Sequence, residues 1–193
     1  AADDDFIVFL AGGPGQSAVD NWSQIAPALA SASKNRHVLL LDQRGTGESN
    51  PLTCAALGNA EAMPEFDTQR IAELTRDCVT EVSQRADPRF YATNDAVADL
   101  EELRQALGAP QFDLVGVSYG TRLAQHYLKR HEEGVRSLVL DSVVPNELAL
   151  GNECARNLSE ALDAQFANGA AGPACAAAYP DPRASLMRLR SAL

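Results

Sequence analysis

A serine flanked by two glycines, in Gly116-Val117-Ser118-Tyr119-Gly120, is the feature that most restricts how this 193-residue chain can fold. It follows an apolar run that begins at Phe112 and precedes a helix-like run that begins at Thr121. A turn this sharp between a strand and a helix forces strained backbone angles on its central residue. We expect a Cβ at either flanking glycine to collide with the neighbouring strand or helix.

Such a turn pushes the serine hydroxyl clear of the sheet, beside a helix N-terminus whose free N–H groups favour developing negative charge. This arrangement is typical of the nucleophile of a serine hydrolase. The five-residue pattern also occurs by chance, so an ordinary exposed serine in a glycine-punctuated turn is the alternative. The strand before it and the helix after it favour Ser118 as a catalytic residue.

Four continuous apolar runs predict strands that are buried on both faces, as in parallel sheets. Helical patterns lie between these runs. Strand alternating with helix predicts a doubly wound, mostly parallel α/β sheet. The predicted strands cover residues 6–10, 38–41, 112–117 and 135–140, and the predicted helices of the core cover 22–32, 94–107 and 121–129.

Two stretches depart from this alternation. Residues 51–91 form a long excursion between a strand and its crossover helix, with a helix of its own expected over 68–84. From Pro145 onward no strand pattern occurs, and alanine-rich helical segments suggest the start of a helical lid. The expected domains are an α/β core over residues 1–145 and the start of the lid, or cap, over residues 146–193, with helices at 149–167 and 184–193.

The composition excludes several classes of partner. The formal net charge is −10, whereas binding to nucleic acid or to an anionic membrane needs clustered Lys and Arg. No apolar run approaches the ~20 residues of a membrane span. Residues 1–5 lack the basic and apolar regions of a signal peptide, so we expect that none existed or that it has been removed.

Attack by a serine on a carbonyl creates an oxyanion that needs two preorganised N–H donors. The amide of Tyr119, directly after the serine, is the expected first donor. The second is expected from the glycine-rich turn after the first strand, Ala11-Gly12-Gly13-Pro14-Gly15-Gln16-Ser17. We favour Gly13 as this donor, with Gly12 as the runner-up. Taken alone, such a turn is more often a plain tight loop.

Asp42 and Arg44 lie in a glycine-containing loop at the carboxyl end of the second strand, the edge at which open α/β sheets bind ligands. They are either substrate-binding charges or, as we favour, internal scaffolding that holds the loop. We expect Asp42 and Arg44, together with Gly12 and Gln16 of the glycine-rich turn, to bind the substrate or to support the residues that bind it.

The cysteines form two local pairs, Cys54/Cys78 and Cys154/Cys175, without metal-ligand spacing. Buried free thiols are one interpretation. We favour two disulfides, which would imply an oxidising compartment and therefore a secreted or periplasmic protein. No metal or cofactor is expected, because the glycine-rich turns do not match the pyrophosphate-binding G-x-G-x-x-G pattern.

A catalytic serine needs a base, usually a histidine. His37 directly precedes its predicted strand, whereas Ser118 lies at the carboxyl end of a parallel neighbour. About five residues of strand therefore place His37 roughly 16 Å below the site. His126 lies eight residues along the helix from Ser118, about 12 Å away, and His131 is further still. Because a general base must come within about 3 Å, we interpret all three as structural or solvent-facing.

Three motifs in order, GGPGQS, LDQRGTGES and GVSYGTRLAQHYLKRHEEGVRSLVLDSVVP, resemble the prolyl iminopeptidase-like branch of the α/β-hydrolases. The chain is similar in particular to the secreted tripeptidyl-aminopeptidase-like group of bacteria, over about residues 6–193. One departure is that this group often has a further cysteine near the position of Gly169, so the pairing of Cys154 with Cys175 is an inference. The resemblance implies serine hydrolysis through an acyl-enzyme.

In that family the catalytic acid and histidine follow the lid, on loops after two later strands that this sequence lacks. Asp141 is a possible acid, because some α/β-hydrolases place it there, but we favour a role in organising the start of the lid. We therefore expect this chain to supply the nucleophile and the oxyanion hole. The remaining C-terminal segment of the same hydrolase is the expected partner.

The favoured substrate is a peptide cleaved from its N-terminus. A carboxylesterase of small acyl esters is an alternative, and a catalytically inactive module that binds a ligand is an alternative of a different class. An aminopeptidase needs carboxylates that bind the free amine of its substrate. The sequence offers four candidates on or just before a predicted helix, but carboxylates on the solvent-exposed face of a helix are an equally good explanation for them. These candidates are Glu147, Glu153, Glu160 and Asp163.

Overall fold

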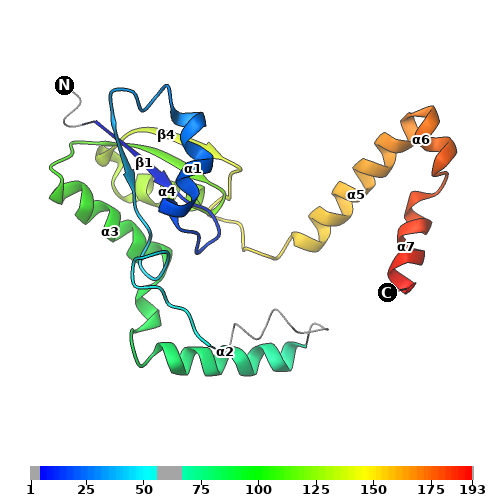
Figure 1. Ribbon diagram of the computed structural model, residues 1–193, viewed down its shortest axis with the longest axis horizontal. Coiled ribbons are helices and arrows are strands. Elements are labelled where there is room, and N and C mark those ends of the chain that lie inside the picture. Colours follow the sequence, from blue (N-terminus) through cyan, green and yellow to red (C-terminus); the bar gives the residue numbers. More distant parts are fainter. Residues whose placement is uncertain (1–4, 56–66, 193) are drawn as a thin grey trace. The chain divides into compact units, whose positions relative to one another are not determined.

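The computed structural model describes residues 5–55 and 67–192. They divide into two compact units, of which the first ends at Asn146 and the second begins at Glu147. The first unit contains a four-stranded parallel sheet in the order β2-β1-β3-β4 (Figure 1). This sheet confirms the predicted α/β class. Its strands are β1 (Phe6–Leu10), β2 (His37–Leu40), β3 (Phe112–Val117) and β4 (Val135–Asp141).

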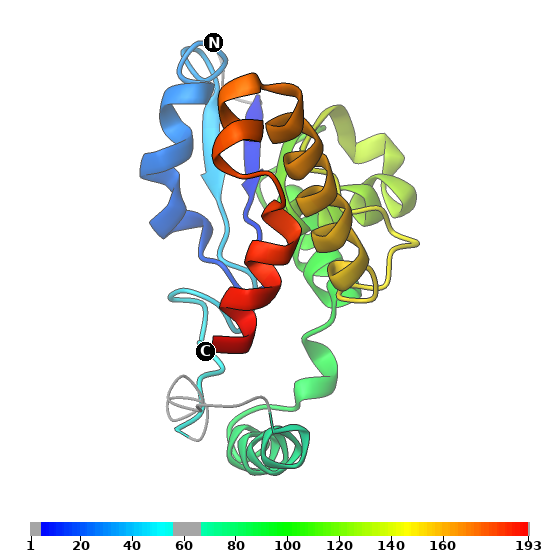
Figure 2. The same ribbon diagram turned by 90° about the vertical axis from the view of Figure 1, so that its right-hand side faces the viewer.

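Helices cover both faces of the sheet. Helix α1 (Ala18–Leu29) lies on one face, and α3 (Thr93–Ala106) and α4 (Tyr119–Arg130) lie on the other (Figures 1 and 2). Side chains of β1 alternate between the two: Val8 and Leu10 join the core against α3 and α4, while Phe9 packs with the α1 side. Burial on both faces explains why β1 and β3 read as apolar runs. The same expectation is wrong for β2 and β4, which end the strand order and are only partly buried or exposed.

The register brings three strand ends to one edge of the sheet. Leu10 pairs with Gly116, and Val117 pairs with Asp141. The glycine-rich turn, the serine turn and the segment after β4 therefore all leave the sheet at its carboxyl edge. This is the edge at which open α/β sheets carry their ligand sites.

Helix α1 begins four residues earlier than predicted, because its first turn has two side-chain partners. Ser17 Oγ accepts a 3.0 Å hydrogen bond from the Asp20 amide, and an Asp42 carboxylate oxygen accepts one of 2.7 Å from the Ala18 amide. Both bonds satisfy donors that a helix N-terminus leaves unpaired.

A buried ionic cluster joins α3 to α4. The fully buried Tyr127 donates a 2.6 Å hydrogen bond from its hydroxyl to Glu101, which also accepts bonds of 2.9 and 2.7 Å from Arg104. The bonds from Arg104 outweigh the cost of burial and, with Tyr127, lower the pKa of Glu101 to about 2. Burial and the bond to Glu101 raise the pKa of Tyr127.

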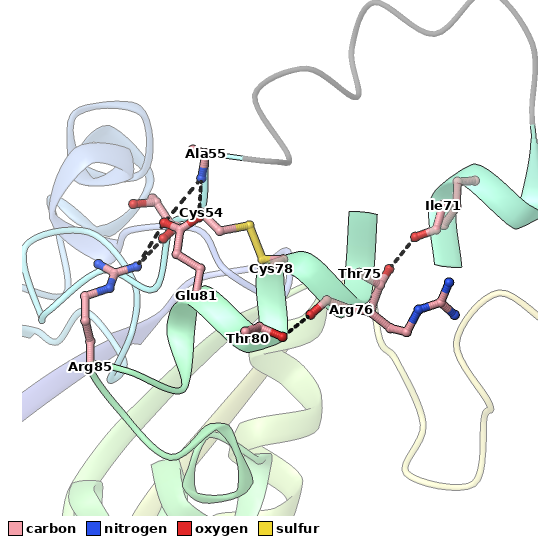
Figure 3. Close-up of a disulfide and its surroundings, with 10 residues drawn as sticks. Cys54, Ala55, Ile71, Thr75, Arg76, Cys78, Thr80, Glu81 and Arg85 are labelled. Atoms are coloured by element: carbon pink, nitrogen blue, oxygen red, sulfur yellow. Dashed lines mark hydrogen bonds and ion pairs between the residues drawn. A yellow bond between two sulfur atoms is a disulfide. The ribbon is translucent and has the colours of Figure 1, made fainter. Parts of the chain in front are cut away.

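The excursion carries helix α2 (Thr68–Val82) and the short helix η2 (Pro88–Phe90). The structure joins Cys54 to Cys78 by a disulfide, the first of the two expected pairs (Figure 3). Beside it, the Ala55 amide donates to Glu81, and Arg85 donates to the carbonyl of Thr53. Residues 56–66 of the excursion, and residues 1–4 of the segment weighed as a signal peptide, lie outside the described residues.

In the second unit, the regular structure described within residues 147–192 consists of the helices α5 (Cys154–Ala171), α6 (Pro173–Ala178) and α7 (Pro182–Ala192), joined by turns. Helix α6 was not predicted; its proline stands at the first helical position, where no N–H is needed. Arg183 of α7 pairs with Asp163 of α5 and lies 5.8 Å from the ring centre of Phe166. Whether this unit acts as a lid stays a prediction.

The expected Cys154–Cys175 disulfide is not present, and this prediction needs correction. Both cysteines are free and exposed. Cys154 begins α5 and Cys175 lies beyond its end, so a rigid helix of roughly 26 Å separates them. Disulfide bonding requires Cα atoms within about 7 Å. Two cysteines close in sequence were mistaken for two that are close in space.

Among the described helices, none is both long and apolar enough to cross a bilayer. Within the same residues, no cluster of three or more His, Cys, Asp or Glu side chains is arranged to hold a metal ion.

Candidate active site

Ser118 occupies the single-residue turn between β3 and α4. Its backbone angles are φ 53° and ψ −120°, in a region that non-glycine residues rarely adopt and that costs roughly 1–3 kcal/mol. The Ser118 amide donates a 2.9 Å hydrogen bond to the carbonyl of Asp141, and its carbonyl accepts one of 2.9 Å from the Thr121 amide. Ser118 is partly buried. The strain predicted from the sequence is therefore present, and the surrounding main chain holds it.

The two flanking glycines stand where backbone segments meet. A Cβ on Gly116 would lie 2.6 Å from the carbonyl oxygen of Gly120. A Cβ on Gly120 would lie 2.0 Å from the carbonyl oxygen of Leu10. Real Cβ contacts are not this short, so both predicted collisions are confirmed and only glycine fits at either position.

The glycine-rich turn after β1 approaches the serine through Gly12. A Cβ on Gly12 would lie 3.1 Å from the Cβ of Ser118 and 2.9 Å from Oε1 of Gln16. Gly13, the next residue, has φ 106°. The structure thus brings Gly12, Gln16 and Ser118 together, and the amide favoured as the second oxyanion donor is one residue further along the turn.

Tyr119 is the first residue of α4, so its amide is one of the N–H groups without an intrahelical acceptor. The buried side chain points away to the start of α3, where its hydroxyl lies 2.6 Å from Oγ1 of Thr93. This contact fixes the side chain of the residue whose amide is the expected first oxyanion donor.

Asp42 is buried, and its carboxylate accepts hydrogen bonds from backbone amides of helix α1 and of the loop that follows β2. The Ala18 and Val19 amides at the start of α1 donate at 2.7 and 3.2 Å, and the Glu48 amide donates at 3.2 Å. Burial raises the pKa of Asp42, but the bonds from these amides and from Ser17 outweigh it, so the pKa lies below its usual value. These contacts favour the scaffolding interpretation.

Arg44 binds the excursion and α3 together. Its guanidinium donates through Nε to Asp99 at 2.7 Å, contacts the same carboxylate through Nη2, and donates to the carbonyl of Phe90 at 2.9 Å. The bond to Asp99 raises the pKa of Arg44. The arginine is therefore occupied by protein partners.

None of the three histidines of the chain lies beside Ser118. His37 is exposed and pairs with Phe6, which in turn pairs with Phe112, six residues and roughly 20 Å before the serine. His126 lies seven residues into α4, where burial and then the charges of nearby basic residues lower its pKa. His131 follows the end of that helix and contacts Tyr127, with ring centres 5.2 Å apart and ring planes tilted by 42°.

Asp141 meets the serine turn through its main chain. Its carbonyl accepts the bond from Ser118, while its exposed carboxylate accepts a 3.0 Å hydrogen bond from the hydroxyl of Ser142. The role of the Asp141 carboxylate in organising the start of the lid stays a prediction.

Most of the carboxylates considered for binding a substrate amine have arginine partners within the second unit. Glu153 and Glu160 both pair with Arg156, and Asp163 pairs with Arg183. Glu147 is exposed.

Sequence reasoning missed two residues around the serine, Thr93 and Thr121. Thr121 is fully buried, and its hydroxyl donates a 2.6 Å hydrogen bond to the carbonyl of Ser118. The sequence shows that Thr121 directly follows Gly120. It does not show whether a buried threonine in a helix makes a specific hydrogen bond or only packs against its neighbours.

Comparison with known proteins gives a family match and several relatives. The family of the alpha/beta hydrolase fold matches residues 5–173. The chain is 28% identical to a tripeptidyl aminopeptidase of Streptomyces lividans over 151 residues, covering 72% of this chain and 28% of that protein. It is 30% identical over 154 residues to the serine protease Hip1 of Mycobacterium tuberculosis, covering 72% and 30%, respectively. It is also 30% identical over 150 residues to a proline iminopeptidase of Neisseria gonorrhoeae, covering 76% and 36%.

The chain thus spans 28 to 36% of the length of these relatives. The parallel sheet, the strained serine turn at its carboxyl edge and the match over most of the sequence agree with one another. The chain belongs to the alpha/beta hydrolase fold family.

Proposed function

We propose that this chain carries the nucleophile and the oxyanion-stabilising amides of a serine hydrolase, and that the enzyme is an aminopeptidase that releases N-terminal residues or short peptides. The observation that carries the proposal is the backbone of Ser118. A serine held at φ 53° and only partly buried at the carboxyl edge of the sheet costs stability, and this strained position is the one that presents a hydroxyl for nucleophilic attack. The names of the relatives support peptides as the substrate class.

In the proposed reaction, Ser118 Oγ attacks the carbonyl carbon of the scissile peptide bond and its proton passes to a base. The carbonyl oxygen becomes an oxyanion, which the amides of Tyr119 and Gly13 bind, with Gly12 as the alternative second donor. The oxyanion collapses, the C–N bond breaks, and the amine leaves with the proton from the base. Water then hydrolyses the acyl-enzyme by the same route and restores the hydroxyl.

The base and its orienting acid are proposed to come from the remaining C-terminal segment of the same hydrolase. His37, His126 and His131 are remote from Ser118, which supports this assignment. A peptide or small ester is the proposed ligand, and neither nucleic acid nor a membrane is a proposed partner. The Cys54–Cys78 disulfide supports an oxidising compartment, so the proposed location is secreted or periplasmic.

The test is labelling of the full-length protein with a fluorophosphonate, which bonds only to an activated serine. We expect labelling at Ser118 and none in Ser118→Ala, with Ser31→Ala, at an exposed serine after α1, as the control outside the site. An unlabelled but folded full-length protein would instead indicate an inactive module that binds a ligand.

Three substrates then separate the two enzymatic alternatives: an aminoacyl p-nitroanilide, its N-blocked form and p-nitrophenyl acetate. An aminopeptidase hydrolyses the first and fails on the second, because its site binds the free amine. A preference for the acetate, with no effect of the blocking group, would identify a carboxylesterase.

A further inference from the structure

We propose that Thr121 is a positioning residue that orients the amide of Tyr119 toward the oxyanion, an inference that rests on the proposed function. The carbonyl of Ser118 accepts two hydrogen bonds from this one residue. The Thr121 amide donates at 2.9 Å and the Thr121 hydroxyl donates at 2.6 Å. Thr121 is 0% exposed, so water does not replace either bond.

Two bonds to this carbonyl set the direction of the next amide. The C=O of Ser118 and the N–H of Tyr119 belong to one planar peptide unit, and in a trans unit they point in opposite directions. Rotation of the carbonyl would turn the amide by the same angle. Thr121 therefore fixes the Tyr119 N–H, which points away from the carbonyl that Thr121 holds.

The same hydroxyl also connects the serine turn to the segment that leads into the second unit. The Val144 amide donates a 2.8 Å hydrogen bond to Thr121 Oγ1. Gln125, one turn further along α4, donates to the carbonyls of Thr121 at 3.0 Å and Val144 at 3.1 Å. With its donor and an acceptor both used, the hydroxyl has one rotational position, as a positioning residue requires.

The test compares Thr121→Val with Thr121→Ser in the full-length protein. Valine keeps the shape and removes the hydroxyl, whereas serine keeps the hydroxyl. We expect Thr121→Val to lower kcat on the p-nitroanilide roughly 10- to 100-fold with KM nearly unchanged, because the loss falls on the transition state. The rate of fluorophosphonate labelling should fall in parallel, and Thr121→Ser should restore both to within about threefold of the wild type.

Thr75→Val is the matched control, since Thr75 also donates its hydroxyl to a backbone carbonyl in a helix, at 2.8 Å, but lies in α2. It should leave kcat unchanged. Should Thr121→Val fail to fold, Thr121→Cys provides a second variant, because its thiol fills the space but donates weakly. Circular dichroism at the assay temperature confirms folding.

An unchanged kcat in folded Thr121→Val or Thr121→Cys, a change in KM alone, or an equal loss in Thr121→Ser would each overturn the inference. If the wild-type protein is labelled and active when this happens, the proposed function stands and only the role of Thr121 fails. A wild-type protein that is neither labelled nor active rejects both.

Discussion

The carbonyl oxygen of Leu10 lies only 2.0 Å from where a Cβ on Gly120 would stand. Leu10 ends β1, from which the glycine-rich turn departs, and Gly120 lies in the first turn of the helix after Ser118. The glycine-rich turn and the serine turn are therefore in close backbone contact where β1 ends. This approach is possible only because residue 120 has no side chain.

Gly120→Ala should destabilise the protein by roughly 3 kcal/mol or more, because backbone rather than a flexible side chain occupies the space of the new methyl group. Urea unfolding measures the loss. Gly169→Ala is the control: a Cβ there meets nothing within 4 Å, and alanine in a helix is favoured over glycine by about 1 kcal/mol. A Gly120→Ala protein as stable and active as the wild type would contradict this packing.

Asp42→Asn should separate scaffolding from substrate binding. The carboxylate accepts bonds from the Ala18, Val19 and Glu48 amides, and an asparagine NH₂ group would face one of these donors. We expect a loss of about 1–3 kcal/mol in the free energy of unfolding, with KM unchanged. Asp20→Asn, on the exposed side of the same helix turn, should cost less. A raised KM with unchanged stability would instead assign Asp42 to the substrate.

The sequence predicts the core of this fold well because its strands and its serine turn depend on local patterns. The apolar runs that begin at Phe6 and Phe112 are strands with the predicted bounds. A Cβ added at Gly116 or Gly120 would collide with neighbouring backbone, as predicted. Cys54 pairs with Cys78 as expected.

The features of the fold and of the site that the sequence does not predict depend on side-chain contacts between segments that are distant in sequence. The start of α1 is set by Asp42, which accepts a hydrogen bond from the amide of Ala18, 24 residues earlier in the sequence. Thr121 acts on Ser118 and Val144 through one hydroxyl, which no spacing reveals. The failed Cys154–Cys175 prediction has the same origin, since sequence separation does not show that a straight helix intervenes.

Acid should selectively remove the contribution of Glu101 to stability. Its pKa is lowered from 4.5 to about 2 in the folded protein, chiefly by Arg104. A lowered carboxylate pKa stabilises the fold above the unfolded value of 4.5, and this contribution is lost as the pH falls toward 2. At neutral pH it amounts to at most roughly 3 kcal/mol.

Urea unfolding of wild type and Glu101→Gln between pH 7 and pH 2.5 measures this dependence. The difference between the two proteins should be largest above pH 4.5 and should shrink steadily below it. Glu102→Gln, an exposed neighbour on α3, should show a small difference at every pH. A Glu101→Gln difference that is constant with pH would show that the carboxylate charge is not what holds α3 to α4.

The two pairs of cysteines should respond oppositely to substitution. Cys54 and Cys78 close a loop with a sequence separation of 24, so their replacement by alanine should cost about 3 kcal/mol, because the unfolded chain regains the freedom that the cross-link removes. Cys154→Ala with Cys175→Ala should change stability by less than about 0.5 kcal/mol, since both thiols are exposed and unbonded. Thiol titration of the native chain should detect Cys154 and Cys175 without reductant, and Cys54 and Cys78 only after reduction and unfolding. A chain in which neither exposed thiol reacts would restore the Cys154–Cys175 pairing that the helix length argues against.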